Sequence, residues 1–154
     1  MPALTADFYS VQQTIVNALE DGTSTTQLPP GVWGKGRYAA SYDMSTGTVA
    51  KSKTLGMVTI PAGVIVIGIE LLISASLGTS AVSIGTSLDT DKYRAVLVHT
   101  TPLISWTNFM VASALVTELA TPIATRELIV IANDATADLP ASGLIVMVVR
   151  TLEP

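Results

Sequence analysis

One run of residues, Val64 to Ala75, limits what this chain can fold into more than any other segment. Every second residue from Ile65 onward is apolar, whereas the residues between them include Gly68 and Glu70. Because successive side chains of a strand point to opposite faces, the run predicts one long β-strand with an apolar face and a mixed face. We expect the apolar row to lie in a core between two sheets: Ile65, Ile67, Ile69, Leu71, Ile73 and Ala75. We expect the mixed row to be partly covered by another subunit: Val64, Val66, Gly68, Glu70, Leu72 and Ser74.

A membrane span is the alternative interpretation of this region, because residues 55 to 77 are mostly apolar and long enough to cross a bilayer. However, Pro61, Gly63 and Gly68 interrupt the run. The carboxylate of Glu70 would lie deep in the lipid, at a cost of about 2.5–3.5 kcal/mol. The two-residue alternation also has no role in a helix surrounded by lipid, so a strand is favoured and no membrane partner is expected.

The composition indicates assembly. Charged residues make up 13% of the 154 residues and hydrophobic residues 49%, whereas charged residues usually supply about 25% of a soluble domain. A surface with so little charge suggests burial between subunits. The net charge is −4, and phosphate binding needs clustered basic residues, so nucleic acid is not expected as a partner. The basic residues near the N-terminus suit an acidic protein neighbour or are simply solvated: Lys35, Arg37, Lys51 and Lys53.

The first 36 residues predict an arm that precedes the main domain. Apolar residues at three- and four-residue spacing, among them Phe8, Val11 and Ile15, predict a helix over about residues 5–20. An extended arm is the alternative, because residues 14–16 are β-branched. Residues 21–36 are polar and rich in proline and glycine, which is typical of an extended connector. We therefore divide the chain into an N-terminal arm, 1–36, and a β-domain, 37–154.

Residues 37–154 contain about eight segments with strand character, separated by turn signals and without a helical pattern between them. Such a series predicts an all-β, antiparallel sandwich, barrel or jelly roll. The expected strands are 37–43, 48–60, 64–77, 81–85, 92–98, 109–119, 127–132 and 144–152, with residues 86–91 as a loop.

No residue pattern indicates catalysis or a cofactor. His99 is the only histidine and has no recognisable triad partners, so we interpret it as a hydrogen-bonded residue at a strand end. The acidic loops 89–91 and 133–138 could supply oxygen ligands to calcium, but they lack the EF-hand pattern and are more typical of turns. With no cysteine, disulfides and thiolate metal sites are excluded. We expect no enzyme activity and no metal or cofactor.

The candidate site is an interface. We expect Glu70, isolated in an apolar strand, to pair across it with Arg94, Arg126 or Arg150. Trp33 is either an anchor at the interface or a lid on its own domain. The interface residues that we predict come from the arm and from the central strand: Phe8, Val11, Ile15, Trp33, Val64, Val66, Glu70 and Leu72.

Four segments resemble small structural proteins of tailed-phage particles. They are a proline–glycine turn with its long apolar strand, 60–71; a strand with the spaced residues Gly85, Ser87, Asp89, Asp91 and Tyr93, within 81–94; and two closing segments, 126–132 and 142–149. Together these features cover residues 48 to 152 and are similar to virion decoration (cement) or head-fibre proteins, notably of cyanobacterial phages.

The resemblance implies a jelly-roll sandwich that forms oligomers, commonly trimers, on the capsid lattice. It also implies binding to the major capsid protein, a location on the capsid surface and assembly in the host cytoplasm. The absence of a secretory signal at the N-terminus agrees with that expectation. The alternatives are a fibre or neck protein of the virion, and a carbohydrate-binding jelly roll or small hydrolase. Aromatic residues, at 5% of the chain, are scarce for a sugar site.

Overall fold

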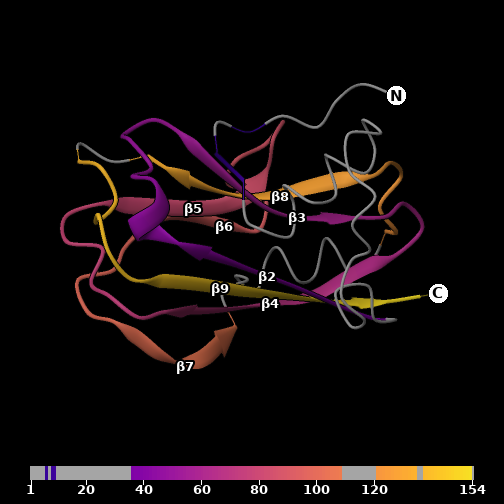
Figure 1. Cartoon of the computed structure of the whole chain (residues 1–154). Coiled ribbons are helices and arrows are strands. Elements are labelled where there is room, and N and C mark those ends of the chain that lie inside the picture. The colour runs from indigo at the N-terminus through magenta and orange to yellow at the C-terminus, as the bar shows by residue number, and fades with distance from the viewer. Residues whose placement is uncertain (1–5, 7, 10–35, 109–120, 135–136, 154) are drawn as a thin grey trace, which may run out of the picture.

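The structure is a computed structural model that describes residues 6, 8–9, 36–108, 121–134 and 137–153. The strands are β1 (Phe8–Tyr9), β2 (Arg37–Asp43), β3 (Thr54–Ile60), β4 (Ile65–Ile73), β5 (Ala81–Thr86), β6 (Arg94–Val98), β7 (Leu103–Asn108), β8 (Glu127–Asn133) and β9 (Leu144–Leu152), and the short 3-10 helix η1 (Met44–Thr46) follows β2. They form two layers, a sheet ordered β1-β3-β8-β5-β6 and a sheet ordered β2-β9-β4-β7 (Figure 1).

The strand order is that of a jelly roll. Strands pair in a nested series, β2 with β9, β3 with β8, β4 with β7 and β5 with β6, and every one of these pairs is antiparallel. Successive pairs alternate between the two sheets, as in a long hairpin that is rolled into a sandwich. The predicted all-β sandwich with about eight main strands and jelly-roll topology is therefore confirmed.

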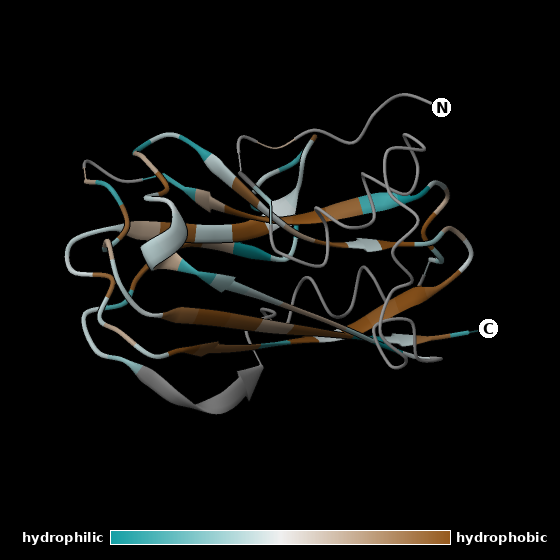
Figure 2. Cartoon of the chain, in the orientation of Figure 1, coloured by the Kyte–Doolittle hydropathy of each residue, from teal (hydrophilic) through white to brown (hydrophobic). Residues whose placement is uncertain are grey.

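The core lies between the sheets and is almost entirely aliphatic. Its residues on strands come from β2, β3, β4, β5, β8 and β9, and Figure 2 shows the apolar character of most of β4, β8 and β9. Among the described residues, the aromatic members of the core are Tyr38, Tyr42 and Tyr93, and burial raises the pKa of both Tyr38 and Tyr42. Fully buried aliphatic residues from both sheets complete it, among them Leu55, Met57, Ile60, Ile69, Leu71, Ile73, Ile84 and Ile129.

A β-bulge in β4 changes which residues of the central strand face the core. Val66 pairs with Thr151 and Gly68 with Arg150, so β4 advances two residues while β9 advances one. The extra residue, Ile67, reverses the alternation at this point. The core residues of this segment are therefore Val64 and Val66 before the bulge, and Ile69, Leu71 and Ile73 after it.

The two predicted rows of the central strand are thus partly wrong. Ile69, Leu71 and Ile73 lie in the core as expected, and Ala75 packs against it. Ile65 and Ile67 are instead half-buried, whereas Val64 and Val66 belong to the core cluster rather than to the outer face. A strict two-residue period cannot hold through a bulge, because the inserted residue moves every later side chain to the other face.

The N-terminal arm is described at Ala6, at Phe8–Tyr9 and at its last residue, Gly36. Phe8 and Tyr9 form the short strand β1, which pairs in parallel with Leu55 and Gly56 of β3. A helix is therefore wrong at these two residues, and the extended alternative holds there. The rest of the predicted helix, residues 21–35 of the connector and the predicted strand 109–119 lie outside the described residues. The domain boundary at residue 36 stays a prediction.

The region that could have been a membrane span, residues 55–77, divides into most of β3, a turn, the whole of β4 and the four residues after it. Among the described residues, none of the helical segments has the length and apolar character needed to cross a bilayer.

Candidate interaction surface

The candidate surface is the outer face of the β2-β9-β4-β7 sheet. Two rows of cross-strand neighbours run over it, Ala39–Val148–Glu70 and Ser41–Val146–Leu72. Val146 and Leu72 are half-buried, and Val148 is buried although it does not belong to the core cluster. The surface is therefore largely apolar, with a single carboxylate among these six residues.

That carboxylate is neutralised within the chain. Glu70 of β4 lies 2.5 Å from a guanidinium nitrogen of Arg150 of β9, with Glu70 18% exposed and Arg150 53% exposed. The two residues are diagonal neighbours in the register, since Val148 pairs with Glu70, and long side chains reach across that spacing. Arg150 was one of the three partners that the sequence suggested, but the pair forms between two strands of one chain. Such a half-exposed pair contributes less than about 1 kcal/mol.

The bulge brings this pair together. With Ile67 as the inserted residue, Glu70 and Leu72 share the outer face, while Val66 is 1% exposed inside the sandwich. The interface prediction is accordingly corrected at Val64 and Val66, whose side chains are enclosed by the core. Leu72 and Glu70 remain on the candidate surface.

The predicted arm residues contribute less to the described structure. Phe8 lies in β1, on the edge strand of the other sheet. Val11, Ile15 and Trp33 lie outside the described residues.

His99 follows the last residue of β6, and its carbonyl accepts a hydrogen bond from the amide of Leu77 at 3.0 Å. Burial, with a smaller contribution from Arg94, lowers the pKa of its imidazole. The described arrangement agrees with a structural residue at the end of a strand, as interpreted from the sequence.

Two carboxylates of the acidic loop 133–138 are hydrogen-bonded within the chain. Asp134 accepts a hydrogen bond from the Ser83 hydroxyl at 2.6 Å, and Asp138 accepts one from the Lys51 amide at 2.9 Å. Within the described ranges, His, Cys, Asp and Glu residues form no group of three that could hold a metal ion.

The sequence analysis did not identify the hairpin of β5 and β6 as a candidate surface. Among the described residues, five large apolar side chains are exposed, and three of them are on this hairpin: Leu88, Val96 and Val98. The available signal was the leucine itself, which interrupts a loop of serine, threonine and aspartate at residues 86–91.

Comparison with known proteins gives two similar structures. A chain in the capsid of Ralstonia phage GP4 superposes with a TM-score of 0.58 at 12% sequence identity, covering 86% of this chain and 93% of that one. The likeness is one of fold. A chain in the capsid asymmetric unit of cyanophage Pam1 has 18% identity and a TM-score of 0.46, with 84% and 95% of the two chains covered. No protein-family model and no curated protein matches the sequence.

Proposed function

We propose that this protein is a structural component of a bacteriophage virion that decorates and stabilises the capsid. The observation that carries the proposal is the shared fold with a chain of the Ralstonia phage GP4 capsid, which extends over 93% of that chain. The sequence resemblance to decoration and head-fibre proteins, over residues 48 to 152, supports the same role independently of the fold. The role needs no catalytic residue.

The mechanism is binding at the junctions between capsomers. The protein binds there as an oligomer, expected to be a trimer, and contacts the major capsid protein on the outside of the shell. Surface that the shell leaves exposed is buried by each bound oligomer. Since the oligomer binds the assembled shell and not its separated subunits, stability rises with occupancy by mass action.

The outer face of β4 is the surface that we assign to contact between copies. Leu72 and Val146 are half-buried in the single chain, and the Glu70–Arg150 pair leaves little net charge beside them. An apolar surface without an uncompensated charge suits an interface between identical subunits.

The test is to identify the protein in gradient-purified phage particles by mass spectrometry, and to locate it by negative-stain imaging with a labelled chain. We expect its peptides at a constant ratio to the major capsid protein, and label over the shell. Light scattering of the purified protein should give about three times the 16.0 kDa chain mass. Absence from the particles would refute the virion role, and a 16.0 kDa species at micromolar concentration would refute self-association.

A further inference from the structure

The loop between β5 and β6 holds one leucine almost completely in solvent. Leu88 is 98% exposed. In the other described turns, the exposed residues are small, polar, charged or proline, as at Ser45, Ala62, Thr79 and Ser142. A fully exposed leucine is therefore an exception among the described turns, and it contributes nothing to the core.

Hydrogen bonds hold the backbone around Leu88 in one shape. The Thr86 hydroxyl accepts from the amides of Leu88 and Asp89, at 3.3 and 3.1 Å. The Thr86 amide donates to the Asp89 carbonyl at 2.7 Å, and the same carbonyl accepts from the Lys92 amide at 3.4 Å. These hydrogen bonds to Thr86 and Asp89 hold the backbone on both sides of Leu88. They therefore fix the direction in which the Leu88 side chain points.

The turn also lies directly on β5. A Cβ placed on Gly85 would be 2.1 Å from the Asp89 carbonyl oxygen and 2.7 Å from the Asp91 amide nitrogen. Only glycine permits this approach, because backbone atoms cannot move aside as the end of a side chain can. Residues 89–91 therefore occupy the space over Gly85, and Leu88 projects beyond them.

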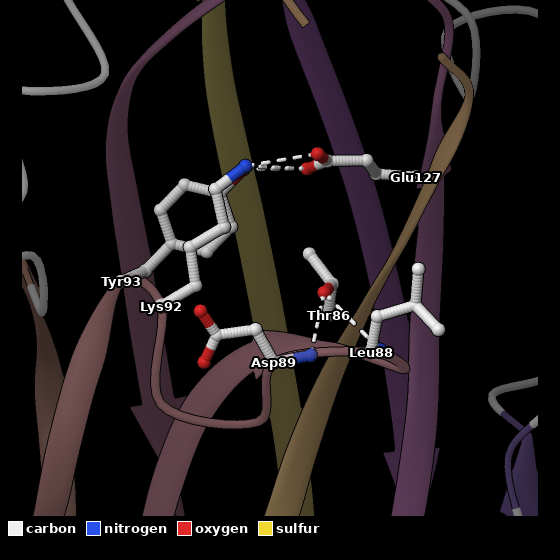
Figure 3. Close-up of polar contacts among 6 residues, drawn as sticks. All are labelled: Thr86, Leu88, Asp89, Lys92, Tyr93 and Glu127. Atoms are coloured by element: carbon white, nitrogen blue, oxygen red, sulfur yellow. Dashed lines mark hydrogen bonds and ion pairs between the residues drawn. The ribbon is translucent and has the colours of Figure 1, made fainter. Parts of the chain in front are cut away.

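A second set of polar contacts fixes the far end of the loop to β8. The Lys92 ammonium lies 2.8 and 3.1 Å from the two carboxylate oxygens of Glu127, and the Tyr93 hydroxyl donates to the same carboxylate at 2.9 Å. In Figure 3, Leu88 lies on the opposite side of Thr86 from Lys92 and Tyr93. The leucine is consequently presented by a loop that is ordered before any partner binds, which lowers the entropy cost of association.

The rim around Leu88 is acidic. Asp89 and Asp91 are both exposed, and a hydrogen bond with the Asp89 carboxyl raises the pKa of Asp91, with a smaller contribution from nearby Asp134. Lys92, the basic residue of the loop, is paired with Glu127. A partner that accepts the leucine must therefore bring positive charge to the edge of its pocket.

We propose that Leu88 is an anchor that inserts into an apolar pocket with a basic rim on a different protein. This inference rests on the proposed function, under which the partner is the shell protein of the capsid. A second copy of this chain suits the site less well, since the chain carries a net charge of −4 and would bring further acidic residues to an acidic rim.

The experiment compares full-length variants in competition for the particle. Wild-type protein and Leu88→Ser are produced together in cells in which phage particles form, and their ratio in gradient-purified particles is divided by their ratio in the cells. Mass spectrometry distinguishes them by the tryptic peptide 54–92, which contains residue 88. Val98→Ser is the matched control, because Val98 is also exposed, at 50%, but pairs with Ala81 at the end of the hairpin away from the loop.

We expect Leu88→Ser to be depleted in the particles about 10- to 100-fold, since the site loses the burial of one leucine side chain. Val98→Ser should keep its ratio within about twofold. Both variants should melt within about 2 °C of the wild type, because each replaced side chain is at least half exposed. The double variant Asp89→Asn and Asp91→Asn should weaken binding mainly at low salt, where the acidic rim acts over the longest distance.

Equal ratios of Leu88→Ser and wild type in the particles and in the cells would overturn the anchor while leaving the virion role intact. Absence of both chains from the particles would remove the virion role, and with it the proposed partner. Sedimentation of the purified proteins is the third measurement. If Leu88→Ser abolishes self-association, the occupant is a second copy of this chain and the basic-rimmed partner is wrong.

Discussion

Placing an aspartate at two adjacent positions of β4 tests the bulge on which the candidate surface depends. Val66 is 1% exposed in the core, and Ile67, the next residue, is half-buried on the outside of the bulge. Val66→Asp loses about 1.5–3 kcal/mol of side-chain burial. It also places an unpaired carboxylate in an aliphatic core, which costs several kcal/mol more. The total is at least about 5 kcal/mol, comparable to the whole stability of a small domain.

Ile67→Asp should lose only about 1–2 kcal/mol, which is part of the free energy of burying one side chain. It adds no cost for a buried charge, because its carboxylate can reach water. The low strand propensity of aspartate affects both variants alike and cancels in the comparison. We expect the difference in unfolding free energy to exceed about 3 kcal/mol. Urea unfolding followed by circular dichroism measures it. If Val66→Asp does not fold, the isosteric Val66→Thr should still cost about 1–3 kcal/mol and Ile67→Thr less than half of that. An Ile67 variant at least as unstable as its Val66 counterpart would refute the bulge.

Three further predictions concern the β5–β6 loop and His99. Gly85→Ala should destabilise the protein by about 1–3 kcal/mol and speed hydrogen exchange in residues 87–92, because its Cβ would be 2.1 Å from the Asp89 oxygen; unchanged melting and exchange would contradict the close approach. Glu127→Gln should cost about 1–2 kcal/mol in urea unfolding, since Lys92 and Tyr93 both lose a charged partner. Glu70→Gln should cost under about 1 kcal/mol, because its partner Arg150 is 53% exposed whereas Lys92 is 22% exposed, and equal costs would contradict this difference between the two pairs. The pKa of His99 is lowered in the folded chain, whereas in the unfolded chain it has its ordinary value of about 6.5. Below this pH the unfolded chain binds more protons than the folded chain, so the free energy of unfolding should fall as the pH decreases. His99→Gln should reduce that loss when urea unfolding is compared at pH 7.5 and pH 5, and an identical loss in both proteins would refute the assignment.

The strand series was predictable from sequence because its signals are local. The expected strand 37–43 matches β2, and the expected strands 127–132 and 144–152 match β8 and β9 to within one residue. Alternation and turn residues decide such segments. β7 was not expected at residues 103–108, where no clear alternation precedes the segment placed at 109–119.

The bulge left a weaker signal. Val66 and Ile67 are both β-branched and apolar, so exchanging their faces leaves the hydropathy pattern unchanged. Gly68 was the one indication, since an isolated glycine within a strand is typical of a bulge. The register between β4 and β9 decides which of these two side chains faces the core. That register depends on residues more than 80 positions further along the chain.

The position of Leu88 within a polar loop is visible in the sequence, but its almost complete exposure depends on contacts that no sequence period records. Gly85 allows the loop to lie on β5, and the Thr86 hydroxyl fixes the turn. Glu127, which is far from Lys92 in the sequence, forms an ion pair with it. Each of these residues is ordinary by itself. Their combined effect on one leucine follows from the fold.

The two proposed surfaces belong to different sheets, and this separation has a physical consequence. Leu72 lies on the outer face of the β2-β9-β4-β7 sheet, whereas Leu88 projects from the loop that covers β5 in the other sheet. The outer faces of a sandwich point in opposite directions, so a copy can contact its neighbours through one face and the shell through the other without competition. Each copy in an oligomer then presents its own Leu88 loop. Once one loop is bound, the others are held at a high effective concentration near the shell, so an anchor of a single leucine is sufficient where several act together.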